Sequence, residues 1–213
     1  MTTRFFRYNY TNPMEKQPTD LLFARRTVRQ YRPDPVPGET IRRLLEAAHA
    51  APSAHNSRPW RFVVLKDPDR RRRLAERMAE AYARDAEADG LAPDSVRARN
   101  ERSVNRIASA PVAVLVFIDE DCLPPNPGRR ADGERLLLVQ SAAAAVQNLL
   151  LAVQAEGLGA CWICAPAFCQ KTVREALDLA DSWVAQALVL IGYPAEQPDP
   201  PAGRMLDEVV LWR

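Results

Sequence analysis

Residues 134–157, ERLLLVQSAAAAVQNLLLAVQAEG, are apolar on almost every side when they are drawn as a helix. A helix with no polar face is stable in water only when it is buried, and four consecutive alanines let other helices approach it closely. Gly157 is a residue type that commonly ends helices. We therefore expect a central buried helix, which lies either in a domain core or between two copies of the chain.

Shorter apolar runs predict the strands of a sheet, and amphipathic segments between them predict helices. The predicted strands are WRFVVL (60–65), VAVLVFI (112–118), ACWIC (160–164), WVAQALVLIGYP (183–194) and EVVLWR (208–213). The predicted helices besides 134–157 are 20–26, 39–50, 67–90 and 93–107. We find no internal repeat and no domain boundary. The pattern predicts an extended N-terminal arm, residues 1–18, and one α+β domain, residues 19–213, with helices on the faces of a mixed sheet.

Composition excludes several classes of protein. The net charge of +2 argues against a nucleic-acid-binding protein, and no run of about 18 uncharged apolar residues suits a membrane span. The N-terminus lacks the apolar core of a secretory signal, so a cytoplasmic protein is the default expectation. Cys161 and Cys164 have the spacing of redox and zinc sites, but buried structural thiols are the favoured interpretation, and we expect no metal.

Three arginines and a threonine lie close together in ARRTVRQY, residues 24–31. If this segment is helical, Arg25 and Arg29 share a face, and with Arg26 and Thr27 they could bind a phosphate group. Three exposed arginines in an arginine-rich chain are the simpler explanation of this segment taken alone. No glycine-rich phosphate loop is present, so any phosphate must be held mainly by side chains.

The loop in AAPSAHNSRPWRFVVL, residues 50–65, has many hydrogen-bonding groups for a short connection. Its composition does not decide between a connector and a site. His49 lies in a predicted helix and is expected to be packed or at the surface, whereas His55 is the one histidine that we consider for function. Because the chain has few marked acids or bases, the sequence favours chemistry carried by a cofactor.

Taken together and in this order, several motifs resemble the nitroreductase family of FMN-dependent oxidoreductases, from about residue 19 to the end. They are RRTVRQY, APSAHNSRPWRFVVL, NLLLAVQAEGLGACWI, IGYP and AGRMLDEVVLW. The resemblance implies a nitroreductase-like fold with a mixed, mostly antiparallel sheet. It also implies a homodimer in which residues of both subunits form each FMN site. The substrate would be a small molecule.

The resemblance further assigns cofactor-binding residues. The FMN phosphate and ribityl chain would be held by Arg25, Arg26, Thr27, Arg29 and Arg204. The partner subunit would contribute the loop residues Pro52, Ser53, Asn56 and Arg58. Asn100 and Ser103 would reach the flavin ring, and the backbone of Trp162, Ile163, Cys164 and Ala165 would pass its N(5) edge. No catalytic residue is assigned beyond His55 as a candidate proton donor.

Within the family, the chain most resembles the C-terminal reductase domain of the bifunctional enzyme of coenzyme F-420 biosynthesis. That likeness implies reduction of the exocyclic double bond of the dehydro precursor of this deazaflavin by hydride transfer from reduced FMN. The chain departs from the fused enzyme in lacking its glutamate-ligase domain. Two alternatives stay open: a broad NAD(P)H-dependent nitro or quinone reductase, and a non-catalytic flavin- or deazaflavin-binding protein. The electron donor, NAD(P)H or a deazaflavin, is likewise open.

Overall fold

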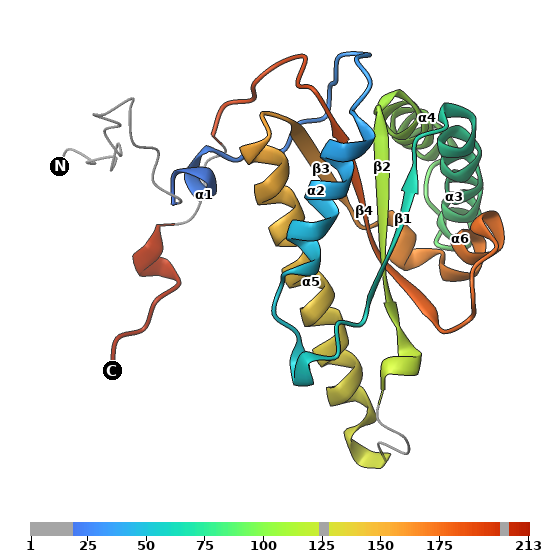
Figure 1. The fold of residues 1–213 in the computed structure, drawn as a ribbon. Helices are drawn as coiled ribbons and strands as arrows, with labels where there is room; N and C mark the ends of the chain where they lie inside the picture. The colour runs from blue at the N-terminus through green and yellow to red at the C-terminus, as the bar shows by residue number, and fades with distance from the viewer. Residues whose placement is uncertain (1–18, 124–127, 201–204) are drawn as a thin grey trace.

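A computed structural model of the chain describes residues 19–123, 128–200 and 205–213, so the expected arm at residues 1–18 lies outside the described residues (Figure 1). Four strands form one sheet in the order β1-β2-β4-β3, and all neighbours are antiparallel. The strands are β1 (Trp60–Leu65), β2 (Val112–Asp119), β3 (Gly159–Ile163) and β4 (Trp183–Gly192). The parallel component expected of a mixed sheet is limited to a single bridge between Thr27 and Ala160.

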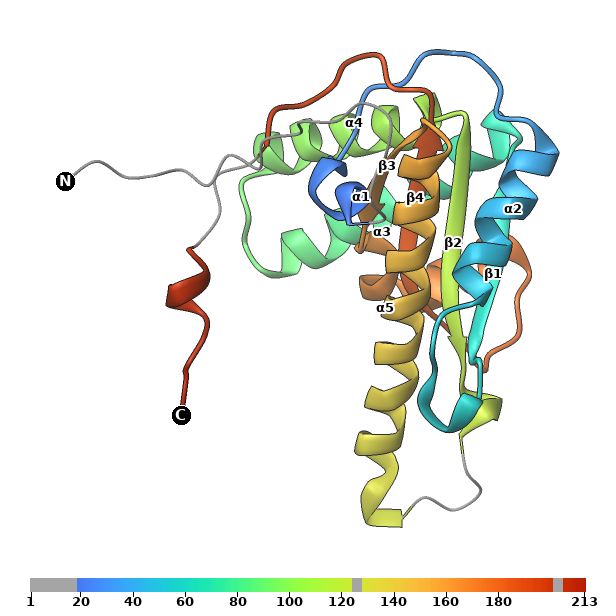
Figure 2. The ribbon, with the colours of Figure 1, turned by 60° about the vertical axis from the view of Figure 1, so that its left-hand side comes forward.

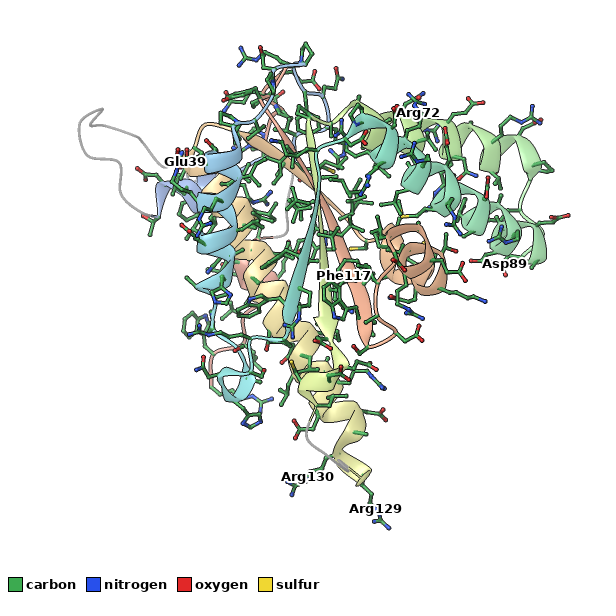
Figure 3. All side chains as sticks on the ribbon, turned by 45° about the vertical axis from the view of Figure 1, so that its right-hand side comes forward. Glu39, Arg72, Asp89, Phe117, Arg129 and Arg130 are labelled. Carbon is green, nitrogen blue, oxygen red and sulfur yellow. The ribbon has the colours of Figure 1, made fainter. Side chains whose placement is uncertain are left out.

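Strand β2 is buried along its whole length, because helices cover both faces of the sheet. On one face lie α2 (Gly38–His49) and α5 (Ala131–Ala155); on the other lie α3 (Pro68–Ala88), α4 (Pro93–Ser109) and α6 (Gln170–Leu177). Figure 3 shows Phe117 of β2 in the layer between the sheet and this second group of helices. A strand buried on both faces has no polar alternation, which explains the continuous apolar run VAVLVFI.

The expected central helix is α5, and it is buried on one side only. Leu138, Ala142, Val146 and Leu149 pack against the sheet and α2, whereas Leu136 on another side is 54% exposed. The N-terminal part of α5 also extends past the end of the sheet (Figure 2). By length and hydropathy alone the helix Gly128–Ala155 could cross a membrane, but a helix packed in a protein core meets the same criteria.

One predicted strand is wrong. Residues 208–213 are not in the sheet: Leu206–Glu208 form the short helix η5, and the chain then continues without regular structure to Arg213. Val209, Leu211 and Trp212 are largely exposed there. Their apolar, β-branched character gave the strand prediction, but this segment has no sheet neighbour among the described residues to pair with.

The remaining elements are short helices at the turns. They are α1 (Asp20–Ala24), η1 (Ala54–Asn56), η2 (Glu120–Cys122), η3 (Gly128–Arg130) and η4 (Ala165–Phe168). The segment between β2 and α5 contains η2 and η3, and its residues 124–127 lie outside the described part of the chain. Figure 3 shows Arg129 and Arg130 at the far end of α5.

The close contact between β3 and the segment after α1 leads to a stability prediction. A Cβ added at Gly159 would lie 2.6 Å from a methyl carbon of Val28, a buried residue. We therefore expect Gly159→Ala to lower the free energy of unfolding by about 1–3 kcal/mol, because the backbone must shift to relieve the overlap. Gly133→Ala in α5 is the matched control, since a Cβ there meets nothing within 4 Å. Urea unfolding of both variants measures the difference, and equal stabilities would contradict the prediction.

Candidate functional site

The arginine segment is extended rather than helical beyond Arg25. Helix α1 ends at Ala24, the Val28 amide donates to the Ala160 carbonyl at 2.9 Å, and Thr27 forms the bridge to Ala160. Side chains alternate along extended backbone, so Arg25, Thr27 and Arg29 lie on one side and Val28 lies on the other. The expectation that Arg25 and Arg29 share a helical face is therefore wrong, yet the same two residues still point the same way.

Unlike Arg25 and Arg29, Arg26 donates hydrogen bonds to backbone carbonyls of the described chain. Its Nη1 donates to the Phe23 carbonyl at 2.7 Å and to the Arg25 carbonyl at 2.9 Å, at the end of α1. Among the described residues, neither Arg25 nor Arg29 has an ion-pair partner. Arg25 and Arg29 are therefore free to meet an anion, whereas Arg26 already serves the C-terminal carbonyls of a helix.

Strand β3 offers an open backbone edge next to this segment. One edge of β3 pairs with β4, and in the described part of the chain the other edge is bridged at Ala160 alone, by Thr27. Beyond the bridge come Trp162, which is 39% exposed, half-buried Ile163 and exposed Cys164. Ala165 then begins η4. Unpaired N–H groups along this edge are suitable hydrogen-bond donors for a planar polar ligand.

Arg106 of α4 is a residue of this region that the sequence reasoning missed. Together with Arg29 it lies near enough to Tyr31 and Cys161 to lower the pKa of both groups, although burial outweighs this effect and raises each pKa overall. The Tyr31 hydroxyl donates to the Val28 carbonyl at 2.7 Å. Two positive charges therefore lie beside β3. Arg106 could have been found from its position one helical turn after Ser103.

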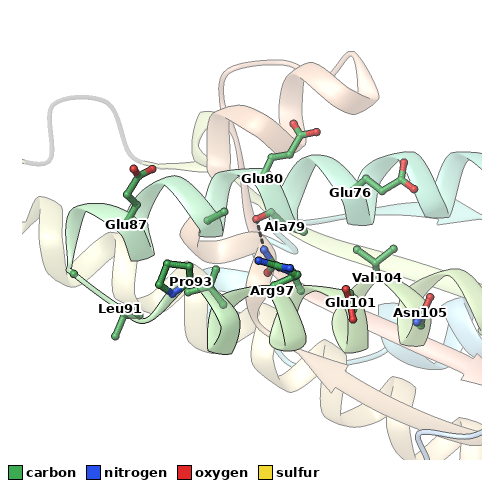
Figure 4. Close-up of a pocket in the computed structure, with 14 residues that line it drawn as sticks. Glu76, Ala79, Glu80, Glu87, Leu91, Pro93, Arg97, Glu101, Val104 and Asn105 are labelled. Atoms are coloured by element: carbon green, nitrogen blue, oxygen red, sulfur yellow. Dashed lines mark hydrogen bonds between the residues drawn. The ribbon is translucent and has the colours of Figure 1, made fainter.

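Asn100 of α4 has one structural contact already. Its Nδ2 donates to the Ala79 carbonyl of α3 at 2.9 Å, and it lines a cavity of about 840 Å³ between α3 and α4 (Figure 4). Ser103 is half-buried on the same helix. This cavity includes none of the arginine segment and none of the loop before β1, so by itself it does not bring the predicted site residues together.

The loop of residues 51–59 has a strained backbone. His55, Asn56 and Arg58 have φ values of 52°, 53° and 45°, in the left-handed region that residues other than glycine rarely adopt. Ser53 supports the turn, because its Oγ accepts from the Arg58 amide at 3.0 Å and its carbonyl accepts from the Asn56 amide at 3.1 Å. Strain of this kind persists only where the surroundings impose it, and it often marks functional sites.

The hydrogen-bond donors of this loop are not all used. The Ser53 hydroxyl keeps its proton available, and Asn56 accepts from Arg58 through Oδ1 at 3.3 Å, which leaves its Nδ2 to donate. Pro52 is exposed, as is the His55 side chain. The His55 Nε2 atom lies 3.9 Å from Glu134 Oε2, at the start of α5.

Within one chain, the loop and the arginine segment lie far apart. The Ala54 amide donates to Ser141 Oγ on α5, whereas Thr27 bridges to Ala160, which comes just after the other end of that helix. At 1.5 Å per residue, Ser141 and the end of α5 are about 20 Å apart. Figure 1 shows η1 and α1 at different levels of α5. One chain therefore presents two separate parts of the predicted site. The remaining predicted phosphate contact, Arg204, lies outside the described residues.

The four cysteines are all free, and no group of three or more His, Cys, Asp or Glu among the described residues could hold a metal ion. Cys161 is buried and Cys164 is exposed. Three residues of extended strand span about 10 Å. A disulfide requires Cα atoms within about 7 Å. The CWIC motif is thus not a dithiol pair in this fold, and only Cys161 fits the expectation of a buried structural thiol.

Comparison with known proteins adds independent evidence. The family model described as the nitroreductase family matches residues 22–193. A Thermus thermophilus protein named NADH dehydrogenase is 34% identical over 89% of this chain and 92% of its own length. A Rhodospirillum rubrum protein named 5,6-dimethylbenzimidazole synthase is 34% identical over 87% and 86%. The crystal structure of a nitroreductase from Desulfovibrio desulfuricans, in complex with FMN, is similar with a TM-score of 0.72 and 28% identity, over 93% of this chain and 98% of that one.

The environments of the cysteines predict their order of reaction with a maleimide. Burial raises the pKa of Cys169 to about 11 and raises the pKa of Cys161, so both remain protonated and unreactive at pH 8, whereas Cys164 is accessible. We expect Cys164 to be labelled first and Cys169 to react only as the pH approaches 11. Peptide mass spectrometry follows each site, and Cys164→Ser should remove the fast phase. Labelling of Cys161 or Cys169 as fast as Cys164 at pH 8 would contradict this order.

Proposed function

This chain belongs to the nitroreductase family and is an oxidoreductase; we propose that it uses bound FMN to transfer electrons from NAD(P)H to a small nitro- or quinone-type acceptor. Support for the cofactor comes from the similar structure solved with FMN, and support for the donor comes from the relative named NADH dehydrogenase. The relation to that protein extends over nearly the full length of both chains.

The observation that carries the proposal is the set of unpaired cationic side chains along the open edge of β3. Arg25 and Arg29 have no ion-pair partner in the described parts of the chain, and Thr27 lies between them on the same side. A phosphate monoester carries nearly two negative charges at neutral pH and accepts bidentate hydrogen bonds from guanidinium groups. The donor set therefore fits the phosphate end of FMN, and Arg26 would serve mainly to fix α1.

We further propose that each site is completed by the loop of a second subunit. The loop of residues 51–59 lies about 20 Å along α5 from the arginine segment of its own chain, yet Ser53 and Asn56 retain hydrogen-bond donors. On α5 the Leu136 side chain is 54% exposed, and exposed apolar area of this kind suits contact with a second copy. In such a dimer, His55 and Arg58 would border the bound ring.

Each group then has a separate task in the reaction. Bound FMN supplies two-electron chemistry between a nicotinamide and an acceptor. Arg29 and Arg106 provide positive charge that would stabilise the negative charge developing on a ring beside β3. The backbone edge from Trp162 to Ala165 offers fixed N–H donors, and the partner's loop excludes water from that edge. His55 is a candidate for holding the proton that the acceptor receives.

Reduction of the dehydro precursor of F-420 is a narrower version of the same proposal. It rests on the likeness of sequence motifs alone, and none of the relatives reported above is named for that reaction. A non-catalytic flavin- or deazaflavin-binding protein is the alternative from another class. Parallel assays with a nitroaromatic, a quinone and the deazaflavin precursor separate these versions, because flavin that NADH reduces without turnover of any acceptor would favour the binding protein.

Removal of one phosphate contact tests the cofactor directly. We expect Arg25→Ala and Arg29→Ala each to raise the Kd for FMN by roughly 10- to 100-fold, because each removes a charged hydrogen bond worth about 1.5–3 kcal/mol. Quenching of flavin fluorescence on titration measures this Kd. Arg42→Ala is the control, since its side chain forms an exposed ion pair with Glu46 on α2. Unchanged FMN affinity in both site variants would contradict the assignment of the arginine segment.

A mixture of subunits tests the shared site. Arg29→Glu and Asn56→Asp each damage one half of it, and co-expression of the two variants gives heterodimers. If one subunit supplies the arginine segment and the other the loop, then each heterodimer has one undamaged site and one doubly damaged site. We expect separately tagged and purified heterodimers to regain about half of the wild-type activity, whereas either variant alone has little. No recovery would indicate that each site is built within one chain.

A further inference from the structure

His49 and Trp60 join the two ends of the strained loop. His49 is the last residue of α2, Trp60 is the first residue of β1, and the loop of residues 51–59 runs between them. The Trp60 Nε1–H group donates to His49 Nδ1 at 3.0 Å, and the two rings meet edge to face with centroids 5.9 Å apart. One side-chain hydrogen bond thus closes a loop of about ten residues.

The Trp60 side of this contact is fixed. Trp60 is 4% exposed and packs with Ala51 and with Ala145 of α5. The indole N–H is the only polar group of its side chain, and His49 is its acceptor in the structure. A change at His49 would leave a buried donor unpaired, and we expect the indole to move together with the loop that covers it.

The His49 side of the contact reaches a predicted cofactor contact. The Arg58 Nη1 atom lies 3.4 Å from His49 Nε2, and Arg58 is one of the three left-handed residues of the loop. Because Trp60 donates to Nδ1, the neutral imidazole must carry its proton on Nε2. The Arg58 contact is therefore a packing contact between two donors, and the Trp60 hydrogen bond alone holds the ring.

We infer that neutral His49 is a positioning residue, which keeps the loop of residues 51–59 in the shape required of one wall of the flavin site. The inference rests on the proposed function, because it takes this loop as part of that site. His49 itself does not touch the reacting atoms. It acts through Trp60, which holds the end of the loop, and through Arg58, which lies against the imidazole.

Protonation of His49 would release the loop. A proton on Nδ1 removes the lone pair that accepts from Trp60 and places a positive charge beside Arg58. His49 shares a groove of about 590 Å³ with three other charged residues, Arg42 and Glu46 of α2 and Lys66 after β1, although Lys66 lies by Gly38 at the other end of the helix. Glu46 is the one acid among them, and it already pairs with Arg42 at 2.9 Å. A fall in pH from 8 to 5.5 that protonates this ring would therefore weaken cofactor binding, because the Trp60 N–H group loses its acceptor.

Two substitutions separate positioning from mere packing. His49→Phe keeps a ring but has no acceptor, whereas His49→Asn keeps an acceptor near the position of Nδ1 and cannot be protonated in this range. Deuterium uptake of the peptide that contains residues 50–60 is measured first, without FMN. We expect uptake to be about tenfold faster in His49→Phe than in the wild type at pH 8, and within about threefold of the wild type in His49→Asn.

FMN affinity is then measured between pH 5.5 and 8. We expect the wild-type Kd to rise as the pH falls, the Kd of His49→Asn to stay flat, and the Kd of His49→Phe to be about tenfold raised throughout. Glu39→Gln, an exposed change on the same helix, should follow the wild type. The inference would be overturned if His49→Phe took up deuterium at the wild-type rate and if its Kd for FMN changed with pH as that of the wild type does. Loss of loop protection in a protein that never binds FMN would instead refute the proposed function and leave the His49 contact in place.

Discussion

Burial of β2 on both faces is the constraint on which the other parts of the molecule depend. A strand without an exposed side chain needs helices above and below it, so α2 and α5 cover one face and α3, α4 and α6 cover the other. The faces of the sheet are then closed to ligands. In the described part of the chain, the outer strands β1 and β3 are the open edges of the sheet, and most candidate site residues lie beside them, whereas Asn100 and Ser103 lie on α4.

The two open edges are specialised in different ways. At β3, an extended arginine segment lies along the strand, and the contact between Val28 and Gly159 is close enough to exclude a side chain at the glycine. At β1, a loop with three left-handed residues is held by Ser53, Ser141 and the pair of His49 and Trp60. The first edge supplies charge, and the second supplies hydrogen-bond donors held in a strained backbone. In the proposed dimer, a second copy would bring both to one ligand.

Most helices and four strands were predicted correctly from the pattern of apolar residues, because the long segments have a clear hydrophobic period and are bounded by strong turn signals. The strand expected at 208–213 failed because residues that favour strands still need a neighbour to pair with, and pattern alone does not supply one. The arginine segment was predicted to be helical as far as Arg26, but α1 ends at Ala24 and the backbone then becomes extended, because Val28 and Thr27 pair with Ala160. Arg106 escaped prediction because its place beside β3 depends on contacts between elements distant in the sequence, and the inferred role of His49 because it depends on a side-chain hydrogen bond across the loop.

The bridge between Thr27 and Ala160 also has a consequence for how the chain folds. It joins segments more than one hundred residues apart, whereas the α3–α4 pair is joined by a turn of only a few residues. Closure of a long loop is entropically unfavourable until the intervening elements are compact, so contacts of this range form slowly. The helical pair can form early, but the arginine segment can take its place only after α5 and β3 have packed. The half of the site proposed to hold the FMN phosphate is therefore expected to appear in the last folding step, and a refolding assay that follows cofactor capture should lag behind one that follows helix content.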